Sequence, residues 1–410
     1  MKGIEPGMPS FGVMSRALRA TTQRLACELA APTARAPRWS PLEWGVARAV
    51  ASMQGCSGVL AGLQHWPRER AWLQFLGEQR TQIAAIQQHA IELLAQIDAG
   101  ARRAGVACVA LKGAALLALG AHGRGQRPMG DIDLLVRPAD AAAMETVLHA
   151  LGYQLGHRAR RHLCYYPPPS GRAAVIGEHR DNPLRIEVHT HVSEALPVTH
   201  ADITASLWPA NPVPGINPYP GIAALMRHLL LHAAGNMRAR ALRMVQLYDI
   251  AVLARRMTGA EWQELTDGRA ATGWWMYPPL ALAERYLPGA IPAAVLTAAR
   301  AACPGWLRWR TGRQVLYDVS WSNLRVEALP GVEWSRSPGE ALRYAYSRVF
   351  PSSLALQELE EGARSMQGIF SVPWYQIPHA QRVLRWLFSR PPRVQTVVCL
   401  RAALGSGPEP

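Results

Sequence analysis

The chain has 410 residues, 49% of them hydrophobic, and a formal net charge of +15. So much apolar sequence excludes wholesale disorder, and the length corresponds to about two or three domains. The longest charge-free stretch, between Asp202 and Arg227, is interrupted by prolines, so we expect no membrane span.

The positive charge is almost entirely arginine, because only Lys2 and Lys112 are lysines among the 44 basic residues. The arginines are spread along the chain without a basic run interleaved with aromatic residues, so nucleic-acid binding is not expected. None of the six cysteines forms a Cys-x-x-Cys pair, and no apolar leader precedes the first helical pattern. We therefore expect a cytoplasmic protein without disulfides or a zinc ribbon.

The first part of the chain reads as helical. Residues 1–37 show no clear periodicity, and we expect them to be poorly ordered. Residues 38–103 are expected to form a helical cap, because apolar residues recur at spacings of three and four between Trp72 and Ile97.

Residues 104–207 are expected to form an α/β (α+β) core, a small mixed sheet flanked by helices. After it we expect a proline-rich connector (208–220), a helical domain (221–303), a mixed helical region (304–404) and a disordered tail (405–410). The strands expected in the core are 106–111, 131–136, 162–166, 173–179 and 184–190, and its helices are 114–121 and 139–151. The helices expected after the connector are 222–234, 238–256, 261–272, 279–286, 293–302, 338–348 and 378–388.

Two acidic residues share one face of the strand 131–136. Because side chains alternate along a strand, Asp131 and Asp133 project together while Ile132 and Leu134 face the core. Neighbouring carboxylates repel each other unless a cation lies between them, and Mg²⁺ prefers carboxylate and phosphate oxygens. The Lys112-Gly113 turn, which opens a helix, offers backbone N–H groups and a cation to an anion. The combination favours metal-dependent phosphoryl or nucleotidyl transfer.

A third carboxylate comes from the strand 184–190. Glu187 shares a face with Arg185 and His189, while the apolar residues between them face the core. It could complete a two-metal site with the aspartates, or it could simply form a salt bridge with Arg185.

The order of these motifs resembles the DNA polymerase beta-type nucleotidyltransferase superfamily. More narrowly, it is similar to a poorly characterised bacterial nucleotidyltransferase-like family. The resemblance spans about residues 75 to 300, and it rests on the segments LKG (111–113), RPMGDIDLLV (127–136), LGY (151–153) and IEVH (186–189), and on the later His228, His232 and Asp249.

The resemblance implies an NTP substrate, Mg²⁺ or Mn²⁺ and transfer of a nucleoside monophosphate to an acceptor (a peptide, protein, sugar or small molecule). Asp131, Asp133 and Glu187 would hold the metals. Phosphate contacts would come from Lys112, Gly113, Arg127 and Gly130. Members of the family often occur beside peptide-modification and polysaccharide genes, so partner proteins from such clusters are possible.

A second set of residues forms a candidate wall of the cleft. His228 and His232 lie one helical turn apart, and Arg243 and Asp249 follow on the next helix. With His189 they could contact the nucleotide or acceptor, or they could pack the two helices together. A zinc site of His189, His191, His228 and His232 is disfavoured because no cysteine accompanies them.

Two other functions remain open. The separation between Gly113 and Asp131 is longer than is usual in the superfamily, which favours a catalytically weak nucleotidyltransferase-like binding or accessory protein. The arginine content leaves room for a helical protein that binds a polyanion, with the aspartate pair incidental.

Overall fold

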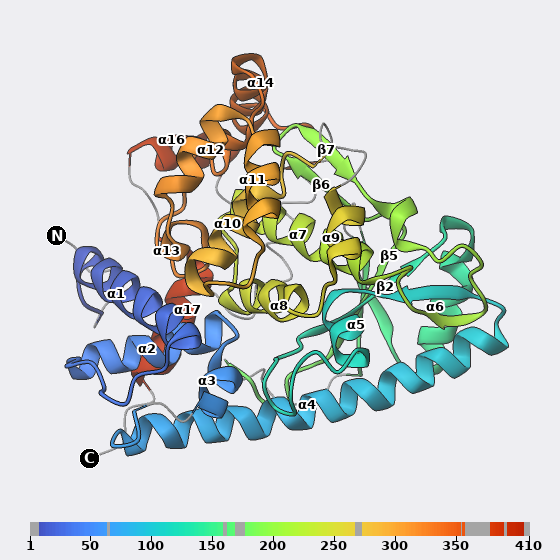
Figure 1. The fold of residues 1–410 in the computed structure, drawn as a ribbon, viewed down its shortest axis with the longest axis horizontal. Helices are drawn as coiled ribbons and strands as arrows, with labels where there is room; N and C mark the ends of the chain where they lie inside the picture. The colour runs from blue at the N-terminus through green and yellow to red at the C-terminus, as the bar shows by residue number, and fades with distance from the viewer. Residues whose placement is uncertain are drawn as a thin grey trace.

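The fold is a mixed six-stranded sheet embedded among helices (Figure 1), seen in a computed structural model. The structure describes residues 8–63, 66–158, 162–168, 177–266, 273–353, 355–356, 378–388 and 392–405. This arrangement agrees with the expected class, a small mixed sheet flanked by helices.

The sheet has the strand order β3-β4-β5-β2-β1-β8. β2 runs parallel to β5 and β1 runs parallel to β8, whereas the other neighbouring pairs are antiparallel. A separate hairpin, β6-β7, follows β5. The strands are β1 (Ala107–Ala110), β2 (Asp131–Val136), β3 (Gln154–Arg158), β4 (His162–Tyr166), β5 (Arg185–His189), β6 (Ser193–Leu196), β7 (Thr199–Asp202) and β8 (Gly215–Asn217).

The helices are distributed before, within and after the sheet. They are α1 (Phe11–Ala30), α2 (Pro41–Met53), α3 (Ser57–Leu63), α4 (Arg70–Arg103), α5 (Lys112–Ala118), α6 (Ala141–Ala150), α7 (Ile222–Arg238), α8 (Met244–Ala254), α9 (Gly259–Thr266), α10 (Tyr277–Tyr286), α11 (Ala293–Ala302), α12 (Gly305–Arg313), α13 (Leu316–Val319), α14 (Pro338–Val349), α16 (His379–Phe388) and α17 (Val394–Gly405). Short 3₁₀ turns are η1 (Pro138–Asp140), η2 (Thr204–Leu207) and η3 (Val332–Trp334).

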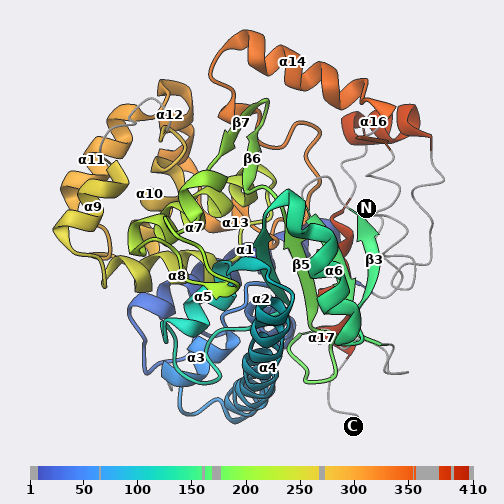
Figure 2. The ribbon, with the colours of Figure 1, turned by 90° about the vertical axis from the view of Figure 1, so that its right-hand side faces the viewer.

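The two faces of the sheet have different partners. One face packs Ile132, Leu134 and Ile186 against α4 and α6, in a core that includes Ile97 and Met144. The opposite face carries the acidic residues of β2 and β5. It lies toward α5 and α7, which supply residues to the same cavity as Glu187; the two views show where these helices lie (Figure 2). The alternation of apolar and polar residues along β2 and β5 thus gives the sheet one apolar face and one polar face.

Most of the remaining helices share one large hydrophobic core that runs from α1 through α7 and α10 to α17; among the described residues, α14 and α16 contribute none to it. Local signals define their starts. At the start of α2, the Ser40 hydroxyl accepts a hydrogen bond from the Glu43 backbone N–H while Glu43 bonds back to Ser40. At the start of α14, the Ser337 hydroxyl accepts a hydrogen bond from the Glu340 backbone N–H, and a proline follows each of the two caps.

Several expectations from the sequence were wrong. Residues 11–30, expected to be poorly ordered, form α1, because Met14, Leu18 and Leu25 recur at helical spacing and are fully buried. The connector contains β8, a strand made possible only by pairing with β1. The expected helix 238–256 begins at Met244, because α7 continues to Arg238.

Other boundaries also differ. The helix expected at 114–121 starts earlier, at Lys112, and ends at Ala118. β3, β6 and β7 were not expected. Within the strand expected at 173–179, residues 177–179 are not in a strand and 173–176 lie outside the described residues, as do residues 406–410 of the expected tail. α4, expected in a separate cap, contributes directly to the core beneath the sheet.

Candidate active site

Parallel pairing of β2 with β5 brings the predicted carboxylates together. Asp133 lies opposite Glu187 in the register, and Asp131 lies opposite Arg185. Paired residues project from the same face of the sheet, so three carboxylates share one surface. The predicted neighbourhood of Asp131, Asp133 and Glu187 therefore follows from strand register alone.

Asp133 is buried and already has two cationic or hydrogen-bonding partners. Lys112 Nζ lies 2.8 Å from Asp133 Oδ1, and His189 Nε2 lies 2.9 Å from the same oxygen. Burial disfavours the charged carboxylate, but Lys112 and His189 outweigh it and hold the pKa of Asp133 well below its usual range. Lys112 and His189 thus stabilise the ionised form of the Asp133 carboxylate.

The other two carboxylates are less well neutralised. The Asp131 side chain is 40% exposed, and Arg185 Nη2 lies 3.7 Å from its Oδ2 atom. Glu187 is 15% exposed and lies 3.6 Å and 3.7 Å from the Nε2 atoms of His162 and His189. Burial, followed by repulsion from Asp133 and Asp131, raises the pKa of Glu187 to about 7. Negative charge on this face exceeds what its neighbours balance.

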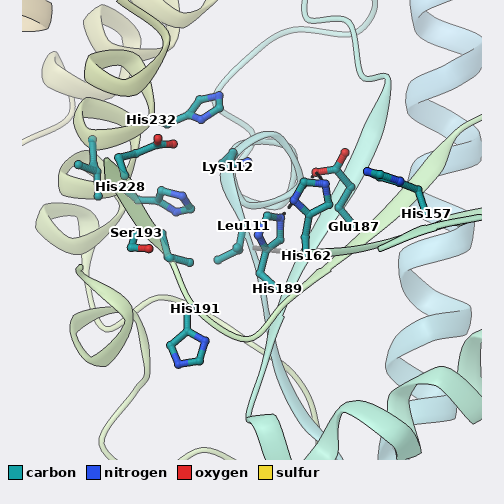
Figure 3. A pocket seen from close by; sticks show the side chains of 13 residues that line it. Leu111, Lys112, His157, His162, Glu187, His189, His191, Ser193, His228 and His232 are labelled. Carbon is teal, nitrogen blue, oxygen red and sulfur yellow. Dashed lines mark ion pairs between the residues drawn. The ribbon is translucent and has the colours of Figure 1, made fainter. Parts of the chain in front are cut away.

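A cavity of about 350 Å³ opens beside Glu187 and is rich in histidine (Figure 3). Asp131 and Asp133 are not among its lining residues, but Lys112 and His189, the two partners of Asp133, are. Strand residues form one side of it and α7 residues form the other. Its lining includes Lys112, His157, His162, Glu187, His189, His191, Ser193, Glu194, His228, Leu231 and His232. The cavity is large enough for a polar group of an acceptor or part of a nucleotide.

The α7 histidines face the cavity as neutral imidazoles. Burial, followed by the nearby Lys112 charge, lowers the pKa of His228 well below its usual value and that of His232 to about 3. His228 Nδ1 lies 2.7 Å from the Tyr219 hydroxyl, which also accepts a hydrogen bond from the Lys112 backbone N–H. His232 Nε2 lies 3.1 Å from the Asn236 amide. The wall predicted from His228 and His232 thus lies close to Lys112.

Lys112 occupies an unusual backbone conformation for its side chain. Its φ of 46° lies in the left-handed region, which residues other than glycine rarely adopt. Such conformations persist where the surroundings impose them, often at functional sites. Here the turn between β1 and α5 directs the ammonium group toward Asp133.

The remaining predicted residues have other partners. Arg127 donates from Nε and Nη2 to both carboxylate oxygens of Asp249, at 2.9–3.1 Å, and His122 Nε2 lies 2.8 Å from the same carboxylate. This geometry favours a structural role for Arg127 over the expected phosphate contact, because its guanidinium is already engaged. Arg243 donates to the Met53 carbonyl oxygen at 2.8 Å and does not line the cavity.

The two predicted glycines also differ from each other. Gly113 is buried under the Arg127 guanidinium, so a side chain there would collide with it. Gly130 is exposed, has no unusual φ and has open space where a side chain would point. Gly113 is therefore required by packing, whereas the structure gives no reason for Gly130.

A family model described as an uncharacterised nucleotidyltransferase matches residues 43–275. The chain belongs to this family. The nucleotidyltransferase match spans α2 to α9 and so includes the whole six-stranded sheet and α7. Searches of curated proteins and of solved structures found no match. Among the described residues of this nucleotidyltransferase family member, no helix is long and apolar enough to cross a membrane.

Three residues of the site escaped the sequence analysis. His162 and His157 lie on β4 and β3, and only the register of β4 against β5 shows that His162 faces His189. The alternation of His162, Cys164 and Tyr166 in the predicted strand was the available signal. Tyr219 lies within the expected proline-rich connector (208–220), where no pattern marks it.

Proposed function

We propose that the chain is a metal-dependent enzyme that transfers a nucleoside monophosphate from an NTP to an acceptor. The observation that supports this best is the pairing of Asp133 with Glu187 across β2 and β5, beside Lys112. In the reaction, an acceptor oxygen or nitrogen forms a bond to the α-phosphorus, and the bond to the leaving pyrophosphate breaks. Transfer of this kind depends mainly on positioning and charge neutralisation.

The donor set suits a hard divalent cation. Asp131, Asp133 and Glu187 offer carboxylate oxygens on one face, and the pKa of Glu187 is raised, first by burial and then by repulsion from Asp133 and Asp131. Mg²⁺ or Mn²⁺ binds such oxygens together with phosphate oxygens. When bound, the ion would neutralise the triphosphate and lower the pKa of the acceptor.

The protein's own groups would position the substrates. Lys112 would contact phosphate oxygens while it remains beside Asp133, and its ammonium group adds the positive charge that the triphosphate needs. The neutral His228 and His232 would contact the acceptor or the base from the α7 side of the cavity. Arg127, held by its ion pair with Asp249, would pack against Gly113 and support it.

One observation favours a second candidate, a nucleotide-binding accessory protein with little or no turnover. Asp133 Oδ1 already contacts Lys112 and His189, so an ammonium group and an imidazole occupy the place where a metal would approach. Nucleotide binding that does not require a divalent ion would identify this alternative.

The test is transfer of labelled α-phosphate, with self-labelling as the readout while the acceptor is unidentified. Wild type should transfer label only with a divalent ion. Asp133→Asn should abolish transfer. Glu187→Gln should lower transfer by orders of magnitude and leave NTP affinity within a few-fold, the pattern of an interaction made mainly in the transition state.

Melting curves accompany each variant. Should a folded Glu187→Gln protein transfer label at the wild-type rate, the third carboxylate has been assigned wrongly. NTP binding without label transfer in wild type, over a panel of acceptors, would support the accessory protein instead.

A further inference from the structure

Two histidines and one carboxylate converge on the strand side of the cavity. His162 Nε2 and His189 Nε2 lie 3.6 Å and 3.7 Å from the same atom, Glu187 Oε2. The three donor atoms all lie within 4.8 Å of one another. Figure 3 shows the three side chains adjacent to each other at the cavity wall. This arrangement differs from the all-carboxylate set predicted from the sequence.

Strand register builds the cluster. β4 pairs with β5 so that His162 lies directly opposite His189, while Glu187 is two residues before His189 on the same face. Side chains directly opposite each other in an antiparallel pair have their Cβ atoms about 4.5–5.5 Å apart. The donors are therefore held by the backbone of a central part of the sheet and need little reorganisation to meet a ligand.

The cluster is sheltered but accessible. The side chains of His189 and Glu187 are 10% and 15% exposed, and that of His162 is 26% exposed. All three line the 350 Å³ cavity. An ion held by them would have protein on the strand side and open coordination positions on the cavity side.

We propose that His162, Glu187 and His189 form a site for a divalent transition-metal or zinc ion, such as Co²⁺ or Zn²⁺. Imidazole nitrogens suit these ions, whereas Mg²⁺ prefers oxygen ligands and waters. Two imidazoles and one carboxylate resemble the three-ligand sets of catalytic zinc sites, which leave a position for water or substrate.

The ion's role rests on the proposed function: it would face the acceptor, while the NTP-bound ion lies nearer Asp131. His189 Nε2 now contacts Asp133 Oδ1 at 2.9 Å. If His189 Nε2 bound the ion, this atom would give up its hydrogen bond to Asp133, so metal binding and the contacts of Asp133 would be coupled.

The experiment uses the full chain, stripped with a chelator and free of nucleotide. Titration with Co²⁺ is followed by visible absorption, and Zn²⁺ is then added as a competitor. We expect one Co²⁺ per chain, displaced by Zn²⁺. His162→Ala should weaken Co²⁺ binding by more than about 100-fold, beyond the 10–100-fold typical for loss of a group behind a ligand.

His191→Ala is the matched control, because His191 lines the same cavity but lies outside the cluster. It should keep the wild-type Co²⁺ affinity. Melting curves without metal establish whether His162→Ala is folded. Pulsed EPR of the wild type with Cu²⁺, an ion that imidazole suits, gives a readout without any variant, since ligating imidazole produces nitrogen couplings.

Absence of a chelator-sensitive Co²⁺ spectrum, unchanged affinity in folded His162→Ala, or absence of nitrogen couplings overturns the site. Label transfer with Mg²⁺ could persist in each of those cases, so the proposed function would stand. Co²⁺ binding that depends on His162, in a wild type that transfers no label, would reject the proposed function and keep the site.

Discussion

Lys112 and Arg127 illustrate how two cations predicted for one task occupy different environments. Lys112 lies at the cavity with its ammonium group on Asp133, whereas Arg127 is fully paired with Asp249 behind the turn. An ammonium group is a compact charge that can contact an incoming phosphate and a carboxylate together, but a guanidinium held at both edges cannot turn away without leaving its partner uncompensated. The two side chains should therefore respond to different assays.

For Lys112, the expected effect is on nucleotide affinity. Lys112→Ala should weaken binding of a non-hydrolysable NTP by about 1.5–3 kcal/mol, the range for a hydrogen bond to a charged group. Lys112→Arg should restore only part of this, because its planar fork cannot reproduce the ammonium geometry. Isothermal titration measures both, and wild-type affinity in Lys112→Ala would exclude the phosphate contact.

For Arg127, the expected effect is on stability. Arg127→Met leaves Asp249, 1% exposed, with only His122 beside it, and should cost about 3 kcal/mol of unfolding free energy. Urea denaturation measures this. The control is Arg256→Ala, since Arg256 bonds the carbonyl oxygens of Leu119 and Gly120 at the surface and should cost less than about 1 kcal/mol. A stable Arg127→Met protein with weakened NTP binding would restore the phosphate role.

Among the elements, β8 shows most clearly what tertiary pairing adds to local sequence. Its three residues lie among prolines and have no strand pattern, yet they pair with β1 and complete the sheet edge. Gly215 has a φ of +106°, which allows the chain to enter the strand beside α4. Asp98 of α4 then accepts a hydrogen bond from the Ile216 backbone N–H at 2.7 Å.

This contact predicts a local loss of protection. Asp98→Ala should destabilise the β8 edge by about 1 kcal/mol, at the low end for a charged acceptor because Asp98 is partly exposed. Hydrogen exchange of the Ile216 and Asn217 amides should accelerate several-fold, while amides of β2 stay protected. Equal exchange in wild type and variant would show that α4 does not hold this edge.

Elements whose own residues show a clear periodicity could be predicted from the sequence, and elements that depend on pairing with distant segments could not. β2, β4 and β5 have alternation that depends only on their own residues, and the acidic face followed directly from it. His162 belongs to the site because β4 pairs in register with β5. Tyr219 belongs to it because the position of β8 brings the Tyr219 hydroxyl to His228. α1 was missed because arginines between its apolar residues masked a helical spacing that the buried Leu18 and Leu25 make plain.

Over the whole molecule, a buried ion pair joins segments distant in sequence. Arg240, which follows α7, contacts Glu333 of η3 at 2.7 Å and Glu327 at 2.9 Å. Gln314 donates a further hydrogen bond to Glu333. Burial opposes the charge of Glu333, but Arg240 outweighs it and lowers the pKa of this carboxyl group.

The lowered pKa fixes the sign of an acid dependence. The stabilisation that ionised Glu333 gives the folded state is complete at pH values above 4.5, the usual pKa of this group. It is lost as pH falls through the lower pKa that Glu333 has in the folded state. Glu333→Gln should cost about 3 kcal/mol at pH 7, because Arg240 is left without its buried counter-charge. The variant's unfolding free energy should also depend less on pH below about 4.5. Denaturation at several pH values checks this, and parallel pH profiles for both proteins would contradict it.

The packing of α17 against α2 has a consequence for synthesis of the chain. Leu404 lies against Gly45, and Arg48 reaches the Ala403 carbonyl oxygen, so α2 meets its partner only after the roughly 340 residues between the two helices have been made. At about 5–20 residues per second, the ribosome takes on the order of twenty seconds to a minute to deliver α17. During that interval the apolar surface of α2 that α17 will cover is open to chaperones and to other nascent chains.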